Sequence, residues 1–266
     1  MKFPVIFVNH GGGPMPLMGQ QPQLARHMQE AVKTYIPEKP KAIVVLSAHW
    51  EASPIQITNY DAPRPLLYDY SGFPPETYRY QYPARGSPNL SHRIHDLLHD
   101  QGISSELEHK RGFDHGVFVP LKIMFPDADI PVVAVSMDAS LDSQRNMQIG
   151  QALAPLREDG ILVLGRGYSF HNLPHFFHPT EASKQAARNF NEWLKETMLS
   201  SSPSEMKQCL MHWDQAPGAK QSHPREEHLI PLFMTAAASD FTGAQVIYDT
   251  TKDADSEHAV TGYLFN

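Results

Sequence analysis

Three short runs of aliphatic residues each end close to a histidine. The runs span residues 4–8, 42–46 and 161–165, and the histidines are His10, His49 and His171. Such runs, rich in β-branched residues, are typical of strands buried on both faces of a parallel sheet. Ligands of open α/β sheets bind outside the carboxyl ends of these strands, and imidazole is the commonest metal-binding side chain. One such histidine is ordinarily a polar residue at the start of a loop, but three predict a histidine site at one edge of one sheet.

His228 is a fourth candidate for this site. Residues 221–230 are expected to open a helix, with Pro224 in its first turn and the following leucines, phenylalanine and alanines on its core face. This position places His228 beside the apolar face, from which it can point toward the end of the sheet.

His115 is a fifth candidate, in the compact segment GFDHG before an apolar helix expected over residues 117–124. The positive end of that helix would lower the pKa of His115 and favour neutral imidazole, which suits a general acid or base. The alternative is a histidine that only caps the helix or lies in its turn.

Five further histidines are assigned to the surface. A helix is expected over residues 89–101, and its three histidines, at i, i+3 and i+7, lie opposite its apolar face: His92, His95 and His99. His175 and His178 lie in a loop that contains proline and phenylalanine, where we expect solvent exposure.

The chemistry of the candidate set indicates a catalytic metal. Nitrogen ligands without thiolates suit Zn, Fe, Cu or Ni rather than Ca or Mg. Three or four of them around an open position are typical of a catalytic site rather than a closed structural one. The spacing does not identify the metal, and a mononuclear zinc hydrolase would present a similar set.

Composition limits the classes of protein that remain. The chain has 266 residues, is 41% hydrophobic and carries a formal net charge of -7, which argues against a nucleic-acid partner. Its one cysteine, Cys209, permits no internal disulfide and indicates a reducing compartment. The N-terminal apolar run is expected to be a strand rather than a signal peptide, and no run reaches transmembrane length. We therefore expect a cytoplasmic protein without a membrane partner.

Helical and strand patterns alternate along the chain, which favours the α/β class. Further helices are expected over residues 20–36, 140–157 and 181–199, and further strands over 55–58, 131–136, 244–248 and 258–265. Residues 200–220 are polar and less regular. Residues 61–88, rich in proline and tyrosine, form either a loop that covers a binding site or a surface crossover packed by its own aromatics.

Six segments resemble one family in their order along nearly the whole chain. They are VNHGGGP, VVLSAHW, YSGFPPETYRYQYPARGSP, GFDHG, FHNL and HPREEHLIPL. Together they are similar to the 4,5-DOPA extradiol dioxygenase branch of the class III extradiol ring-cleavage dioxygenases. The resemblance implies one catalytic domain over residues 1–266 and a three-layer α/β/α sandwich around a largely parallel or mixed sheet. It also implies a non-haem Fe(II) enzyme, with Zn(II) possible in the same site.

The same resemblance implies roles for single residues. His10, His49 and His228 match metal ligands, and His171 matches either a further ligand or an acid/base beside the metal. His115 matches a catalytic group next to the ligands. The implied reaction opens the ring of a catechol such as DOPA with O2, beside rather than between the two hydroxyl groups. The protein would act as a monomer or a homodimer.

One segment departs from the family pattern, and this leaves the substrate open. The family's first motif is commonly HGSP, whereas this chain has HGGGP, which changes the wall beside His10. Arg225, close to His228, is a candidate partner for a substrate carboxylate. Two other functions remain as alternatives: a zinc hydrolase in which the metal generates hydroxide, and a binding protein with a decayed site.

Overall fold

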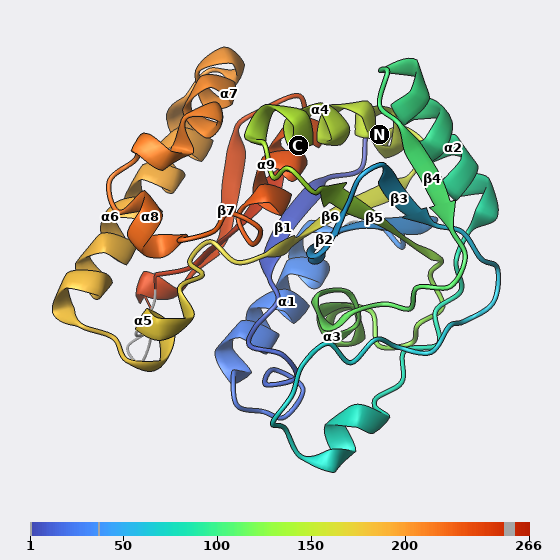
Figure 1. Cartoon of the computed structure of the whole chain (residues 1–266), viewed down its shortest axis with the longest axis horizontal. Helices are drawn as coiled ribbons and strands as arrows, with labels where there is room; N and C mark the ends of the chain where they lie inside the picture. The colour runs from blue at the N-terminus through green and yellow to red at the C-terminus, as the bar shows by residue number, and fades with distance from the viewer. Residues whose placement is uncertain (1, 37, 253–258) are drawn as a thin grey trace.

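A computed structural model describes residues 2–36, 38–252 and 259–266, and its strands form one mixed sheet (Figure 1). The spatial order in this described part is β4-β3-β5-β2-β6-β1-β8-β7. The strands are β1 (Val5–Asn9), β2 (Ala42–Ala52), β3 (Ile55–Thr58), β4 (Ser105–Glu108), β5 (Val132–Asp138), β6 (Ile161–Gly167), β7 (Ala244–Asp249) and β8 (Thr261–Phe265).

The centre of the sheet is parallel, as the continuous apolar runs predicted. Strands β5, β2, β6 and β1 pair in parallel, whereas β3 is antiparallel to β5, and β8 is antiparallel to β1 and β7. Arg166 of β6 is level with Val8 of β1 on one side and with Ser47 of β2 on the other. The carboxyl ends of the three strands that precede His10, His49 and His171 therefore lie side by side.

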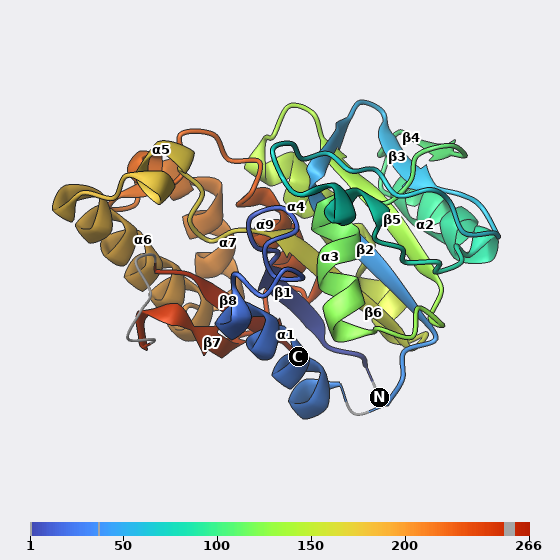
Figure 2. The same ribbon diagram turned by 90° about the horizontal axis from the view of Figure 1, so that it is seen from below.

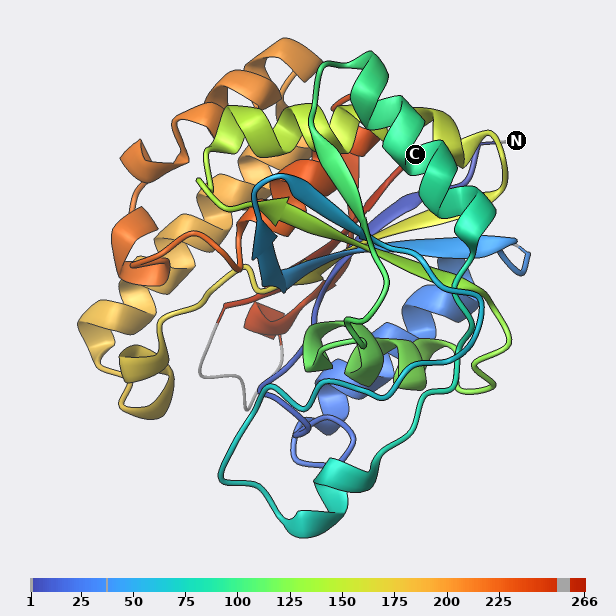
Figure 3. The same ribbon diagram turned by 45° about the vertical axis from the view of Figure 1, so that its right-hand side comes forward.

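Helices cover both faces of the sheet, which confirms the three-layer α/β/α fold (Figure 3). One face packs against α1 (Pro22–Tyr35) and α3 (His115–Met124), which lie in front of the sheet in Figure 2. The other face packs against five helices: α2 (Pro88–Asp100), α4 (Ser143–Ala152), α6 (Glu181–Ser200), α7 (Pro203–Met211) and α9 (Ile230–Ala238). The short helices α5 (Leu173–Phe177) and α8 (Ala219–Ser222) complete this side of the molecule.

Strand β2 is longer than its apolar run and is irregular at the site. Its pairing with β5 shifts between Leu46, opposite Val135, and Glu51, opposite Met137. More residues of β2 than of β5 span this interval, so β2 bulges there, and bulges re-aim side chains next to active sites. His49 lies within this bulge rather than after the strand.

The prediction that residues 221–230 open a helix is wrong. Helix α9 begins only at Ile230, and Pro224 lies in the irregular segment before it. This segment docks against the end of β6, where the Tyr168 N–H donates to the carbonyl of His228 at 2.9 Å. The close approach depends on Gly167, because a Cβ there would lie 2.0 Å from that carbonyl oxygen. His228 is therefore held by the strand end rather than by a helical turn.

Other boundaries differ less. The polar stretch 200–220 contains α7, which begins with a capping box between Ser202 and Glu205. The last strand begins at Thr261, and residue 258 of the expected strand lies outside the described residues. None of the helices in residues 2–36, 38–252 and 259–266 has the length and hydropathy needed to cross a membrane.

Candidate metal centre

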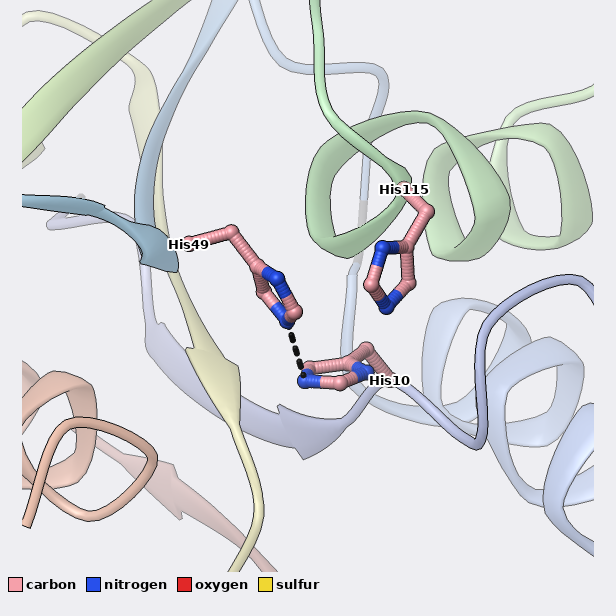
Figure 4. Close-up of side chains that lie close together, drawn as sticks. All are labelled: His10, His49 and His115. Atoms are coloured by element: carbon pink, nitrogen blue, oxygen red, sulfur yellow. Dashed lines mark hydrogen bonds between the residues drawn. The ribbon is translucent and has the colours of Figure 1, made fainter. Parts of the chain in front are cut away.

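Three elements bring His10, His49 and His115 together (Figure 4). His10 follows β1, His49 lies in the bulge of β2, and His115 is the first residue of α3. The Nε2 atoms of His10 and His49 are 3.2 Å apart, and the ring centroids of His49 and His115 are 4.1 Å apart. The three imidazoles form a buried group within reach of a single ion.

His171 and His228 form a second group beside the first. Their rings stack with centroids 3.4 Å apart, and Glu227 lies against both. The His228 ring is also 5.2 Å from the His10 ring and 5.0 Å from the His49 ring, measured between centroids. The structure thus brings all five histidines singled out in the sequence to one place. The implied ligand set of His10, His49 and His228 draws on both groups.

The Nδ1 atom of each implied ligand faces an acceptor. The pairs are His10 with the Gly11 carbonyl at 2.6 Å, His49 with Asp69 at 3.1 Å and His228 with Glu227 at 2.8 Å. A neutral imidazole has one N–H, so a proton assigned to Nδ1 by these acceptors leaves the lone pair on Nε2. Metal-binding histidines are held by such a hydrogen bond from the nitrogen that does not bind the metal.

The 3.2 Å between the Nε2 atoms of His10 and His49 fits two ligands of one ion. Two nitrogens at about 2.1 Å from an ion are about 3.4 Å apart at a tetrahedral angle and about 3.0 Å apart at an octahedral one. A direct hydrogen bond between these rings would need a second proton on one of them, because both Nδ1 atoms already face acceptors. The donor set therefore fits a divalent metal held by imidazole nitrogen.

Burial keeps most of the imidazoles neutral, which is the state that binds metal. Burial and the neighbouring imidazoles lower the pKa of His10, and burial lowers the pKa of His115 and of His228. Burial also lowers the pKa of His49, but the hydrogen bond and charge of Asp69 and other nearby carboxylates outweigh it and raise this pKa.

Two carboxylates at the site were not found by sequence reasoning as functional residues. Asp69 accepts from the Nδ1 atoms of both His49 and His115, at 3.1 and 2.8 Å. Burial alone would raise the pKa of Asp69. The hydrogen bonds and charges of His115 and His49 have the larger, opposite effect, so the pKa of Asp69 lies well below its usual range. Its one sequence signal is that it is the carboxylate within the tyrosine-rich segment PLLYDYSGF.

Glu227 has the equivalent role on the other side of the site. It lies 2.8 Å from Nδ1 of His228 and 3.3 Å from Nδ1 of His171. These contacts lower its pKa despite the burial that raises it. Glu227 lies in the irregular segment before α9, which begins at Ile230, so it is not part of that helix.

The start of α3 is fastened to β2 by Asp114. This side chain caps α3 by accepting from the Val117 N–H at 3.2 Å, and it accepts from the Ser47 hydroxyl at 2.9 Å. A Cβ on Gly116 would lie 2.9 Å from Cδ2 of His49, so glycine permits the helix to approach this closely. The contacts fix His49 and His115 relative to each other.

A cavity of about 390 Å³ opens onto these histidines. Its volume is at the lower end of the range of about 300–1,000 Å³ for small-molecule sites. Its walls are mainly apolar: Met15, Phe73, Phe170, Leu173, Phe176 and Phe177.

The proline- and tyrosine-rich loop of residues 61–88 is both packed by its own aromatics and part of the cavity wall. It is packed by its own aromatics, with the Tyr68 and Tyr70 hydroxyls donating to the carbonyls of Tyr80 and Thr77 at 2.6 and 2.7 Å. It also contributes Tyr70, Ser71 and Phe73 to the cavity wall. The HGGGP turn lies against it, because a Cβ on Gly13, whose φ is +54°, would lie 3.2 Å from Phe73.

Arg225 lies outside the cavity wall. Its guanidinium donates two hydrogen bonds to Glu51, at 2.7 and 2.6 Å, and lies 3.5 Å from Glu227. This bidentate pairing leaves the expected role of Arg225, as partner of a substrate carboxylate, without support.

An α/β sheet that gathers imidazoles and carboxylates at the base of an apolar cavity defines a class of enzymes with a histidine-held metal site. Comparison with known proteins agrees. The family model described as the catalytic LigB subunit of aromatic ring-opening dioxygenase matches residues 4–256. The chain therefore belongs to this extradiol dioxygenase family and is an enzyme of the extradiol type.

Named relatives cover most of the chain. A protein of Beta vulgaris named 4,5-DOPA dioxygenase extradiol is 35% identical over 246 residues, covering 92% of this chain and 90% of the relative. Dioxygenase tasH of Hapsidospora irregularis is 36% identical over 257 residues, covering 89% and 78%. The crystal structure of an uncharacterized protein from Escherichia coli K12 superposes with a TM-score of 0.78 at 29% identity, covering both chains fully.

Proposed function

We propose that this protein opens the ring of a catechol with O2, in the manner of the relatives named 4,5-DOPA dioxygenase extradiol. One observation carries the proposal: the Nδ1 atoms of His10, His49 and His228 all face acceptors, so their Nε2 lone pairs are free beside one apolar cavity. Such an arrangement suits a metal with open positions for a substrate.

His10, His49 and His228 are the proposed metal ligands, with Fe(II) as the expected metal and Zn(II) as a possible occupant of the same site. A divalent ion held there would supply Lewis-acid chemistry toward the catechol oxygens and O2. Imidazole ligands add no negative charge, so the site retains its attraction for a catecholate anion.

His115, and His171 if it is not a ligand, act as the acid/base groups of the proposed reaction. His115 donates Nδ1–H to Asp69, so its Nε2 is the atom that accepts a phenolic proton from a catechol in the cavity. Burial keeps His115 neutral and ready for that step. His171 is held in the same way by Glu227, and its role is either a further ligand or a second acid/base. The aromatic walls offer apolar surface to the reacting ring.

The organisation of the whole chain is part of the proposal. A single catalytic domain over residues 1–266 is supported by the membership of all described strands in one sheet. A cytoplasmic location and a monomeric or homodimeric state stay predictions from the sequence.

Oxygen uptake tests the proposal against a zinc hydrolase. Protein purified anaerobically and reconstituted with Fe(II) is offered a panel of catechols, DOPA included, while dissolved O2 and the visible spectrum are followed. We expect O2 consumption together with a yellow ring-opened product. Strict dependence on Zn(II) with ester or amide cleavage, and no O2 consumption, would instead establish the hydrolase.

A further inference from the structure

We propose that the cavity selects catechols whose ring carries an apolar side chain, in preference to charged ones such as the amino acid DOPA. The inference rests on the proposed function and names the substrate class of the same site.

The first argument is the absence of a partner for charge. Within the described parts of the chain, the cavity wall contains no lysine, arginine, aspartate or glutamate. Asn172, also in the wall, already has hydrogen-bond partners within the protein. Its amide nitrogen donates to the carbonyl of Gln221 at 2.7 Å, and its oxygen accepts from the His175 N–H at 3.3 Å. A carboxylate or ammonium on the ring substituent, away from the proposed metal, would lose water without gaining a lysine, arginine, aspartate or glutamate partner in the wall, which is costly.

Arg225, the candidate cation from the sequence, is unsuited to a carboxylate. Arg225 is paired with both oxygens of Glu51 and lies close to Glu227, so a further anion would have to displace one carboxylate and approach another. Glu227 is not in the cavity wall: its Oε1 faces the two imidazoles, and its Oε2 lies 3.5 Å from the Arg225 guanidinium.

The second argument is the exposed apolar rim. Leu173 and Phe177, both on α5, are 52% and 66% exposed and line the cavity. They are two of the four large hydrophobic side chains recorded as exposed in the described residues, the others being Leu67 and Leu199. Exposed apolar surface gathered at a pocket marks a binding site for apolar groups. An alkyl or aryl substituent on the catechol ring would cover this rim.

A homologous series of substrates tests the inference. The series is catechol, 4-methylcatechol, 4-ethylcatechol and 4-propylcatechol, compared with dopamine, dihydrocaffeate and DOPA, whose chains are similar in length but charged. We expect kcat/KM to rise up to about fourfold for each added carbon, the ratio for a fully buried methylene. We also expect 4-propylcatechol to exceed each charged compound by about tenfold or more.

Calorimetric titration of Zn(II)-loaded protein without O2 provides a second readout that needs no turnover. The Kd values should fall along the alkyl series and rise for the charged compounds. Equal or better binding and turnover of DOPA or dihydrocaffeate would overturn the inference while leaving ring cleavage intact. If no catechol is cleaved, the proposed function fails, and the titration still decides the binding preference; absence of binding by every catechol would overturn both.

Two variants assign the effect to the rim. Phe177→Ala should flatten the dependence of Kd on chain length, whereas Leu199→Ala, which removes an exposed side chain on α6 that does not line the cavity, should preserve it. Both side chains are exposed, to 66% and 46%, so we expect both variants to fold. An unchanged slope in Phe177→Ala would show that Phe177 does not contact the substituent.

Discussion

Replacing Asp69 by asparagine should weaken metal binding although Asp69 is not itself a proposed ligand. The carboxylate accepts Nδ1–H from His49 through one oxygen and from His115 through the other. An amide of the same shape keeps one acceptor and turns the other into a donor, which faces an N–H. One imidazole must then rotate or change its tautomer, and either change removes an Nε2 lone pair from the site.

The expected loss of metal affinity can be taken from other proteins in which a carboxylate orients a metal-binding histidine. Loss of a partner that orients a metal-binding histidine costs about 10–100-fold in metal affinity, or about 1.4–2.7 kcal/mol. The change should be largest when His49 is the ring that loses its acceptor, because His49 is a proposed ligand and His115 is not.

Competition between the protein and a chelator for Zn(II) measures this affinity directly, without requiring turnover. Asp61→Asn is the matched control, because Asp61 is an exposed carboxylate in the same loop. We expect the control to retain the parent affinity. Equal Zn(II) affinity in Asp69→Asn and Asp61→Asn would refute the argument that Asp69 orients the site.

Three further predictions follow from the site and the core. Glu227→Gln should lower kcat/KM and metal affinity by about 10–100-fold, since two imidazoles share this carboxylate; parent-like values would contradict its role. Gly116→Ala should reduce Zn(II) affinity by displacing His49, while Gly243→Ala, with open space around its Cβ, should not; equal affinities would refute the contact. Burial lowers the pKa of His223 to about 3. In the unfolded chain His223 binds a proton with a pKa near 6.5, whereas in the folded protein it stays neutral down to about pH 3. The free energy of unfolding therefore decreases as the pH falls from about 6.5 toward 3. The loss by pH 5 is about 2 kcal/mol, and urea unfolding of His223→Phe should show a smaller loss.

The fold class was predictable from the sequence because its signals are local. The runs at residues 4–8, 42–46 and 161–165 are apolar at every position, as strands covered on both faces must be, and they became the adjacent parallel strands β1, β2 and β6. The convergence of His10 and His49 follows from that arrangement, because parallel strands end at the same edge.

The parts that were not predictable depend on contacts between distant segments. Asp69 reaches His115 only because the loop of residues 61–88 folds back onto the start of α3, and no pattern around Asp69 encodes that contact. The start of α9 was misplaced because residues 223–229 have helix-like composition but are held against β6 by the bond between Tyr168 and His228. The bulge that aims His49 likewise depends on pairing with β5.

Isotope labelling tests the central claim most directly. The Fe(II)-reconstituted protein is supplied, under ¹⁸O₂, in turn with each catechol of the panel, DOPA and 4-propylcatechol included, and the products are examined by mass spectrometry. Extradiol cleavage predicts a ring-opened product that carries both oxygen atoms of one O2 molecule. An intact catechol ring, or a ring-opened product whose new carboxylate carries no ¹⁸O, would contradict the assignment of this site as a ring-opening dioxygenase centre.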